Sequence, residues 1–457
     1  MKHAFAVLAL ALAGTASAAP RTMRFDYFHT GNAKEERFSW DRVVVEPLPW
    51  PGNPARPLDD LNLGRYFFEV HDAASDRVVY SRGFASVFGE WETTAEAGKI
   101  DRTFSESLRF PLPDAPVNVV LKKRDARNEF REVWRAAIDP KGMFVDTSAP
   151  PSPAPLLELQ KSGDPGGKVD FLILGDGYTK EEEQKFEKDA RRLVDTLFQT
   201  PPFREHRSDF NVWGLCPAAA ESGISRPSTG VHRRNPVGSS YDSFGSERYV
   251  LTFDNHAFRE IAQFAPYEFV EILVNGKTYG GGGIFNLYST VAADSEWAPY
   301  VFVHEFGHHF SALADEYYTS DVAYQTGGAK IEPWEPNATA LLDPEHLKWK
   351  DLVPAGTPVP TPWKKETFET RSRAIRAANR PEEEMNALFR AEREDDTKLL
   401  GTDKYSGKVG AFEGANYEAR GYYRPQEDCI MFTRDEVGFC AVCRRALERV
   451  IGLYTGH

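Results

Sequence analysis

The segment His304-Glu305-Phe306-Gly307-His308 places two histidines four residues apart, with a glutamate directly after the first. On an α-helix, side chains four residues apart lie above one another on one face. Two such imidazoles can bind a single cation, and the adjacent carboxylate can reach a water molecule at that ion. The pattern predicts that His304 and His308 are Zn²⁺ ligands and that Glu305 is the general base and acid.

A pentad with three fixed positions also occurs by chance on helices, as a solvated or buried histidine pair. The surrounding sequence favours the metal. Val301-Phe302-Val303 precede the pentad and Phe310 follows it, so the helix is largely apolar. Burying two histidines and a glutamate in such a helix would leave their polar groups unsatisfied unless a cation is bound.

The first residues predict export. Residues 1–18 combine a basic start at Lys2, an apolar run from Ala4 to Leu12 and the small residues Ala16-Ser17-Ala18. This pattern is typical of a signal peptide, and the mature chain should begin near Ala19. No later stretch approaches the roughly 18 apolar residues of a membrane-spanning helix. We therefore expect a secreted or periplasmic protein without membrane insertion.

The net charge of the chain is −13, which argues against nucleic acid or anionic lipid surfaces as general partners. The expected partner is a protein or peptide substrate, and the oligomeric state stays open. A length of 457 residues predicts two or three domains, at about 150 residues per domain.

Short runs of alternating apolar and polar residues dominate positions 19–138 and predict strands, for example Tyr66–His71 and Val117–Leu121. A β-sandwich buries such half-apolar strands, so we expect a non-catalytic N-terminal β-sandwich module. Prolines cluster in residues 139–164, which predicts an extended linker. The catalytic domain should then span residues 165–457, giving an α+β fold overall.

The catalytic region predicts a mixed twisted sheet covered by helices, with the active-site helix at about 297–313 packed beneath it. The expected strands are 169–174, 210–215, 249–253, 269–274 and 285–291, and the other expected helices are 180–197 and 257–264. The glycines at 280–283 predict a flexible turn, because the lysine and helix of a phosphate-binding loop do not follow them. A long insertion spans 319–428, and its charged part at 371–398 predicts a solvated helix pair.

Several motifs together resemble the IgA-peptidase family of secreted bacterial zinc metallopeptidases, in the metzincin-like clan. They include the zinc helix from His304 to Tyr317 and also Val87–Ala97, Leu174–Tyr178, Phe412–Ala415, Tyr423–Pro425 and Cys429–Met431. The resemblance implies a metzincin-like zinc-protease domain that hydrolyses peptide bonds of proteins. It also implies that Met431 lies beneath the metal as an apolar floor. IgA cleavage itself is not implied by any stretch of this chain.

The third ligand departs from the clan's pattern. Ser311 stands where the clan has a helix-ending glycine, and Ala314 stands at the usual ligand position. The resemblance to relatives with a Leu-x-Asp-Glu-Tyr sequence implies Asp315 as the third metal ligand. Asp315 lies seven residues beyond the second histidine, about 10 Å along a straight helix, so the helix must stop or turn near Ala312. Glu316 is the alternative, and either carboxylate could instead orient a histidine.

Other residues near the site have less defined roles. His309 lies about 100° around the helix from its neighbour, which points it away from the metal. Some relatives place a tyrosine two residues after the methionine, but this chain has Thr433 there. The open candidates for stabilising the oxyanion are Tyr317, Tyr318, Tyr422 and Tyr423.

The four cysteines are Cys216, Cys429, Cys440 and Cys443. In an oxidising compartment they could form disulfides, with three possible pairings. A structural zinc site at Cys440-x-x-Cys443 is the alternative, but the sequence has no matching second pair.

Two alternative functions stay open beside the endopeptidase. One is a scaffold, catalytically modest or inactive, that binds a surface glycan or protein; the intact Glu305 argues against it. The other is a zinc amidase that acts on cell-wall peptides. The cleavage specificity is not encoded in any motif we recognise.

Overall fold

The computed structural model describes residues 20–318, 330–376, 382–435 and 437–456. The predicted signal peptide lies outside the described residues, as does the start of the predicted insertion. Within the described residues, no helix combines the length and apolar character needed to cross a membrane.

The N-terminal module is a β-sandwich, as predicted. Its two four-stranded sheets have the orders β5-β1-β2-β8 and β4-β3-β6-β7. Residues from both sheets share one core, including Phe25 and Tyr27 of β1 and Phe68 of β3. The bounds are β1 Arg21–Gly31, β2 Glu36–Pro49, β3 Tyr66–Asp72, β4 Val78–Phe84, β5 Arg102–Pro111, β6 Val117–Arg124, β7 Phe130–Ile138 and β8 Val145–Asp146.

The predicted linker carries two short strands. β8 lies in it and pairs in parallel with β2. β9 (Leu157–Gln160) pairs antiparallel with β11 and so already belongs to the sheet of the catalytic region. The proline-rich stretch between them therefore crosses from one sheet to the other, and the exact domain boundaries stay a prediction.

The catalytic region is built on a mixed six-stranded sheet with the order β15-β16-β14-β10-β11-β9. Four central strands are parallel and are buried along their whole length, because helices and loops cover both faces. The two edge strands, β15 and β9, run antiparallel to their neighbours. The bounds are β10 Val169–Asp176, β11 Phe210–Leu215, β14 Phe269–Val274, β15 Gly281–Ile284 and β16 Tyr288–Ala292.

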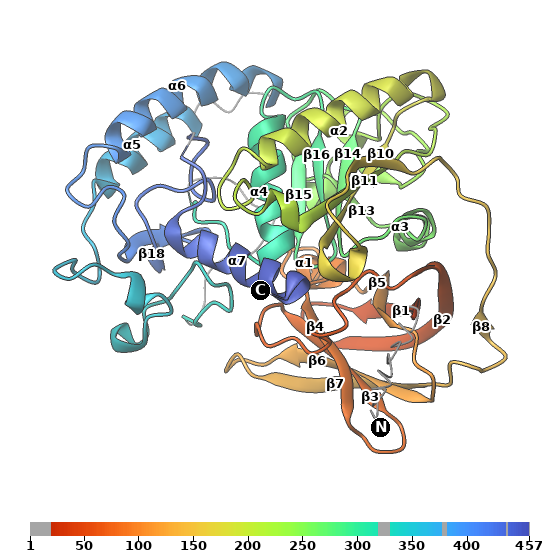
Figure 1. Ribbon diagram of the computed structural model, residues 1–457. Coiled ribbons are helices and arrows are strands. Elements are labelled where there is room, and N and C mark those ends of the chain that lie inside the picture. The colour runs from red at the N-terminus through yellow and green to blue at the C-terminus, as the bar shows by residue number, and fades with distance from the viewer. Residues whose placement is uncertain (1–19, 319–329, 377–381, 436, 457) are drawn as a thin grey trace, which may run out of the picture.

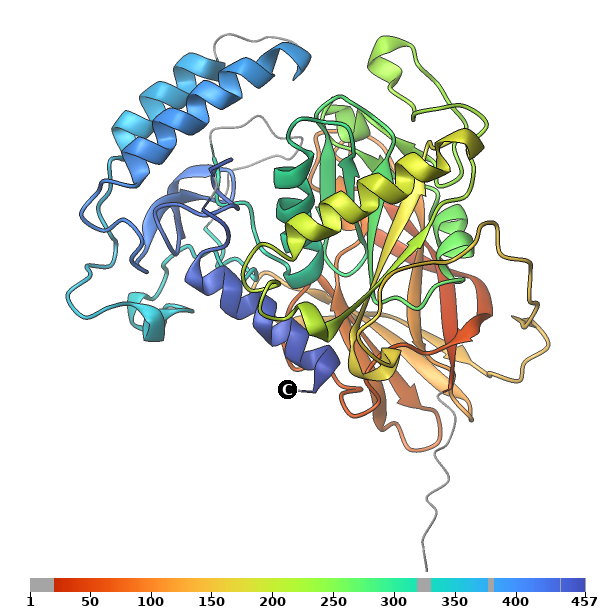
Figure 2. The ribbon, with the colours of Figure 1, turned by 45° about the horizontal axis from the view of Figure 1, so that its top comes forward.

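The helix that carries the histidines, α4, packs against β15 and β16 and contacts both α2 and α7 (Figures 1 and 2). In Figure 1 the N-terminal module lies below this layer, and α5 and α6 form a separate pair at the upper left. The bounds are α1 Val87–Trp91, α2 Glu183–Leu197, α3 Asn255–Ala262, α4 Ala298–Ser311, α5 Lys365–Arg376, α6 Glu382–Leu400 and α7 Ala441–Thr455, with the small strands β12 Ser239–Ser240, β13 Leu251–Thr252, β17 Phe412–Ala415 and β18 Glu418–Arg424.

Two expectations for the catalytic region were wrong, and a third strand has different bounds. The glycines at 281–283 form the edge strand β15 and not a flexible turn. The strand predicted near 285–291 is confirmed as β16, with its start moved to Tyr288, and it forms a hairpin with β15. The predicted strand 249–253 is reduced to β13, which pairs with β12 outside the main sheet. Pairing with a neighbouring strand, and not the local sequence pattern, decided where these strands form.

The N-terminal module shares its packing with the catalytic region. Phe88 and Trp91 of α1 and Phe104 of β5 are buried in the same core as the central sheet. The backbone also crosses the junction, since the Ala85 amide donates to the Phe285 carbonyl at 2.9 Å. The two parts therefore meet through both apolar and hydrogen-bonded contacts.

Candidate metal centre and active-site cleft

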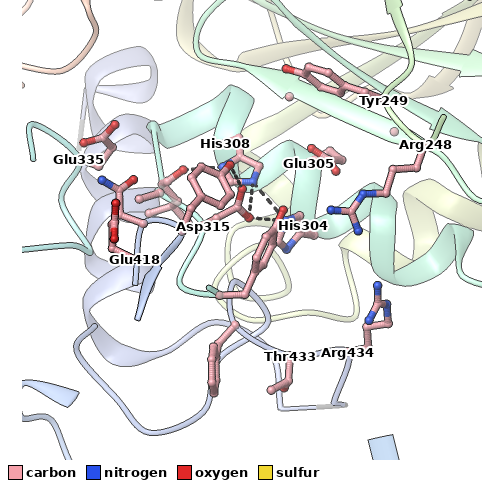
Figure 3. A pocket seen from close by; sticks show the side chains of 18 of the residues that line it. Arg248, Tyr249, His304, Glu305, His308, Asp315, Glu335, Glu418, Thr433 and Arg434 are labelled. Atoms are coloured by element: carbon pink, nitrogen blue, oxygen red, sulfur yellow. Dashed lines mark hydrogen bonds and ion pairs between the residues drawn. The ribbon is translucent and has the colours of Figure 1, made fainter. Parts of the chain in front are cut away.

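The helix α4 ends where the predicted role of Asp315 requires it to end. Ala312 adopts a left-handed conformation, with φ of 56°, and reverses the chain. The reversal brings Asp315 back to the histidines, so that its Oδ1 lies 3.1 Å from Nε2 of His304 and 3.2 Å from Nε2 of His308 (Figure 3). The stop predicted near Ala312 is confirmed.

The hydrogen bonds of the two imidazoles fix their orientation. Nδ1 of His304 donates to the carbonyl oxygen of Ile430 at 2.9 Å, and Nδ1 of His308 donates to the carbonyl oxygen of Leu313. A carbonyl oxygen only accepts hydrogen bonds, so in the neutral rings the proton is on Nδ1 and the lone pair is on Nε2. Both lone pairs therefore point at the same carboxylate oxygen.

This arrangement fits a bound cation. The two Nε2 atoms are 3.1 Å apart, and the edge of a tetrahedron with metal–ligand bonds of about 2.0–2.1 Å is close to 3.3 Å. Two nitrogen lone pairs and a carboxylate oxygen thus converge, and a divalent cation between them would satisfy all three.

Glu305 lies beside this cluster and faces the cleft. Burial raises the pKa of its carboxyl group above the usual range, although the neighbouring His304 and His308 oppose that shift. Arg248 extends toward Glu305 from the far side of the cleft (Figure 3). A carboxylate of raised basicity next to a metal centre is suited to accept a proton from water.

The glycines of β15 allow α4 to lie against the sheet edge. A Cβ atom at Gly283 would come within 2.5 Å of the Glu305 carbonyl oxygen and 2.9 Å of the His308 Cβ. A Cβ at Gly281 would meet Val301 at 2.5 Å. Strand and helix therefore approach so closely that only glycine fits between them.

The carboxylate of Glu316 is turned away from the two histidines. It accepts a hydrogen bond from Asn337 Nδ2 at 2.9 Å and lies 3.3 Å from Cys443 Sγ, below the cleft. Of the two carboxylates that the sequence left open, the structure brings Asp315 to the histidines.

The segment around Met431 packs against the helix turn between the two histidines. The sulfur of Met431 lies 3.2 Å from the position that a Cβ of Gly307 would occupy, so the side chain packs under the turn between the two histidines. The Met431 carbonyl accepts from the Glu316 amide at 2.8 Å, and the preceding carbonyl binds His304. Met431 is fully buried, in the place that the resemblance implied.

His309 is part of the core. Its Nε2 accepts from the Val270 amide at 3.0 Å, and its Nδ1 donates to the Ile284 carbonyl at 3.1 Å. Burial lowers its pKa to about 3, which keeps the ring neutral. It joins α4 to two strands of the sheet and points away from the candidate metal centre, as expected.

The candidate tyrosines divide into two groups. Tyr317 and Tyr422 line the cleft. Tyr318 stacks on Phe432, and the backbone of Tyr423 pairs with Thr339. Thr433, at the position where some relatives have a tyrosine, also lines the cleft, and its hydroxyl donates to Asp428 at 2.6 Å.

Sequence reasoning missed Tyr417. It belongs to the two-residue turn between β17 and β18, where Asn416 and Tyr417 both have positive φ, and its hydroxyl donates to Oδ2 of Asp315. The asparagine was a turn signal, but nothing local placed this turn beside the histidines.

The cleft itself has a volume of about 590 Å³ and is formed by several parts of the chain. The N-terminal module contributes residues from around α1 to the lining of the cleft. The α5–α6 pair forms another wall and is only partly solvated, because Phe389 is fully buried. Lining residues from these parts include Arg65, Glu90, Thr93, Phe368, Phe389, Glu392 and Arg393.

Two family models match this chain. Residues 157–451 match the family described as IgA Peptidase M64, and residues 16–135 match the Peptidase M64 N-terminus. Among solved structures, metalloproteinase-II from Bacteroides fragilis is similar at 10% identity over 52% of this chain and 82% of that chain, with a TM-score of 0.20. A likeness this weak carries no further argument. No curated protein matches.

The mixed sheet, the helix with its His-Glu-x-x-His group and the adjoining cleft define a metallopeptidase. More narrowly, the chain belongs to the M64 family of peptidases, with the N-terminal domain of that family ahead of the catalytic region.

Proposed function

We propose that the protein is an exported zinc-dependent endopeptidase that hydrolyses internal peptide bonds of protein substrates. Its membership in the M64 family already makes it a metallopeptidase. The observation that carries the finer proposal is the convergence of His304 Nε2, His308 Nε2 and Asp315 Oδ1, all within 3.2 Å of one another, beside Glu305 in a cleft.

His304, His308 and Asp315 are the proposed zinc ligands. Two imidazoles and one carboxylate are a donor set typical of catalytic zinc, which leaves a further position open. Bound there, zinc supplies Lewis acidity, which polarises a carbonyl and makes a coordinated water more acidic. The Nδ1 hydrogen bonds to the Ile430 and Leu313 carbonyls hold both rings in the ligating orientation.

Glu305 is the proposed general base and acid. Its carboxylate removes a proton from the attacking water as the oxygen bonds to the carbonyl carbon of the substrate. The same carboxyl group then delivers the proton to the amide nitrogen as the carbon–nitrogen bond breaks. Partial burial, which raises its pKa, makes Glu305 a better proton acceptor than an exposed carboxylate.

The edge strand β15 is the proposed binding element for an extended polypeptide. Gly281 and Gly283 of β15 line the cleft next to Glu305 and His308. The amide and carbonyl of Gly281 already pair with the Arg248 carbonyl and the Val250 amide, so a substrate segment would pair with the strand from Gly283 onward, through backbone hydrogen bonds of the kind that a sheet edge offers. The neighbouring strand β16 cannot serve in this way, because it lies between β15 and β14 inside the sheet.

The test is the variant Glu305→Gln, assayed on casein. It should retain zinc and lose about 10²–10⁴-fold in turnover. Glu366→Gln, at an exposed position on α5, is the matched control and should behave as wild type. Retained activity in Glu305→Gln would exclude the proposed base.

The same assay separates the alternatives. Casein cleavage that a chelator abolishes supports the endopeptidase, whereas a binding scaffold cleaves nothing with or without chelator. Cleavage of muropeptides without cleavage of casein would identify a cell-wall amidase. For the proposed export, the N-terminal residue of protein recovered outside the cytoplasm should be near Ala19.

A further inference from the structure

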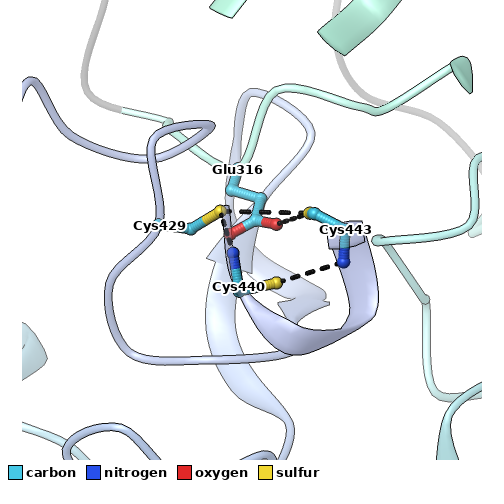
Figure 4. A group of neighbouring side chains, drawn as sticks. All are labelled: Glu316, Cys429, Cys440 and Cys443. Atoms are coloured by element: carbon cyan, nitrogen blue, oxygen red, sulfur yellow. Dashed lines mark hydrogen bonds between the residues drawn. The ribbon is translucent and has the colours of Figure 1, made fainter. Parts of the chain in front are cut away.

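A second group of side chains that could bind a metal ion comes together apart from the two histidines (Figure 4). It consists of Glu316, Cys429, Cys440 and Cys443, all buried, with one ligand atom from each lying within 4.8 Å of every other. The four residues come from three separate segments: the chain after α4, the methionine segment and the start of α7. In the sequence, only Cys440 and Cys443 had the spacing of a metal-binding pair. The fold brings the sulfur of Cys429 and the carboxylate of Glu316 to that pair.

The spacing of the side chains fits a tetrahedral site. The sulfurs of Cys429 and Cys443 are 3.9 Å apart, and the Cys443 sulfur lies 3.3 Å from Oε1 of Glu316. Around zinc, with Zn–S bonds of about 2.3 Å and Zn–O bonds of about 2.0–2.2 Å, the corresponding edges are about 3.8 Å and 3.5 Å. The group is therefore already close to the size that a single ion requires.

The carboxylate of Glu316 is incompletely satisfied. Its Oε2 is buried and has no hydrogen-bond partner within the described part of the chain. The guanidinium of Arg424 donates instead to the backbone carbonyls of Gly414 and Glu427. A buried carboxylate oxygen without a donor indicates a missing positive partner.

Backbone amides point at the sulfurs. The Cys440 amide donates to the Cys429 sulfur at 3.2 Å, and the Cys443 amide donates to the Cys440 sulfur at 3.5 Å. Cys440 is also the N-cap of α7, a helix of 15 residues, where the helix dipole favours negative charge. Each of these amides favours the thiolate form of the sulfur that accepts from it, and the thiolate is the form in which cysteine binds metals.

We propose that Glu316, Cys429, Cys440 and Cys443 bind a second divalent cation, Zn²⁺, separate from the one at the histidines. Three thiolates select zinc over the oxygen-preferring cations Mg²⁺ and Ca²⁺. Four protein ligands in a buried position leave no room for substrate, so this ion is structural and not catalytic.

The position of the second ion gives it a role in shaping the first site. Glu316 follows Asp315 directly, and Cys429 precedes Ile430, whose carbonyl orients His304. One ion at the cluster would fix both segments to the start of α7. It would thereby hold the third ligand and one histidine of the catalytic centre in place.

The first experiment measures the metal content of the full mature chain purified without chelators. Wild type should contain two zinc ions per chain. The variant His304→Ala/His308→Ala should retain one ion, and Cys443→Ser should lose one. Cys216→Ser is the matched control, since Cys216 is half-buried outside the cluster, and it should retain both.

A thiol count separates the metal site from a disulfide. Wild type denatured with chelator and without reductant should titrate as four free thiols if the cluster binds metal. Two free thiols would show a disulfide and overturn the proposal. A wild type with one ion that His304→Ala/His308→Ala removes entirely would overturn it as well, while leaving the proposed peptidase function intact.

Cobalt substitution gives a readout that does not depend on activity or on a folded cysteine variant. His304→Ala/His308→Ala loaded with Co²⁺ should show thiolate-to-cobalt charge-transfer absorption, because the remaining ion is held by sulfur. Absence of that absorption in a folded, cobalt-treated protein contradicts the proposed ligands.

Discussion

The hydroxyl of Tyr417 donates a hydrogen bond to Asp315, a residue 102 positions earlier in the chain. The contact is supported by the backbone, since the Asn416 amide donates to the Asp315 carbonyl at 2.9 Å and the Tyr417 amide donates to the Tyr317 carbonyl at 3.1 Å. The hairpin of β17 and β18 thus holds the segment that carries the candidate third ligand. Tyr417 acts on the site through Asp315 and is a positioning residue.

Replacing Tyr417 with Phe tests that role. The ring would keep its packing but Asp315 would lose one hydrogen bond, so zinc affinity at the histidine site should fall about 10–100-fold. Titration against a competing chelator measures this. Tyr423→Phe, on the same hairpin, is the control and should bind zinc normally. Equal affinity in Tyr417→Phe and wild type would contradict a positioning role.

The close approach of β15 to α4 predicts that Gly283 cannot be enlarged. In Gly283→Ala the added methyl would meet the backbone of Glu305, and either the strand or the helix must shift. A displacement of about 1 Å at a catalytic group costs on the order of 10²-fold in rate. Gly167→Ala is the control, because nothing lies within 4 Å of its added Cβ. Steady-state kinetics on casein compares the two, and full activity in Gly283→Ala would show that the contact is not tight.

Ala312 ends α4 in a conformation that favours glycine. Alanine at φ of 56° is strained by about 1–2 kcal/mol, and glycine would relieve this strain. Part of that gain is offset because glycine has more conformational freedom in the unfolded chain, which its folding must overcome. Ala312→Gly should therefore stabilise the protein by about 0.5–1 kcal/mol. Denaturant unfolding measures the change. Ala314→Gly, two residues on, should destabilise by a similar amount, and a destabilised Ala312→Gly would show that the lost methyl packing outweighs the strain.

The buried His29 predicts a pH dependence in the N-terminal module. Burial alone would lower its pKa, but the carboxylates of Glu106 and Glu36, each at 3.1 Å, raise it above the usual value of 6.5. The folded protein therefore binds the proton of His29 more tightly than the unfolded chain does. This difference adds to the free energy of unfolding in full below about pH 6.5. It is lost as the pH rises through the folded-state pKa, by at most about 1.4 kcal/mol per pH unit.

His29→Gln should remove this component. The free energy of unfolding, measured from about pH 6 to 9, should fall in wild type and change less in the variant. His232→Gln, at an exposed position, serves as the control and should follow wild type. Parallel curves for wild type and His29→Gln would exclude the histidine as the source.

Local rules predicted much of the catalytic region. The spacing of His304 and His308 follows from helix geometry, which depends on neighbouring residues only. The stop of the helix near Ala312 was predicted from a distance: a continuous helix would have carried Asp315 about 10 Å away from the second histidine. The sandwich in the N-terminal module likewise followed from alternation along each strand.

Other features were invisible because they depend on pairing between distant segments. The glycines at 281–283 have no strand pattern of their own, and they form an edge strand because β16 pairs with them while α4 packs close above. The N-terminal module borders the cleft through contacts that its own alternating pattern could not report.

The sequence by itself determined the chemistry of the chain: a histidine pair at helical spacing, an adjacent acid, and an aspartate one short turn beyond the helix. The tertiary structure alone decided which carboxylate faces the histidines, which tyrosine holds it, and that Glu316 meets three cysteines. The reason is physical: the first set follows from backbone geometry over a few residues, whereas the second follows from packing between segments separated by more than 100 residues.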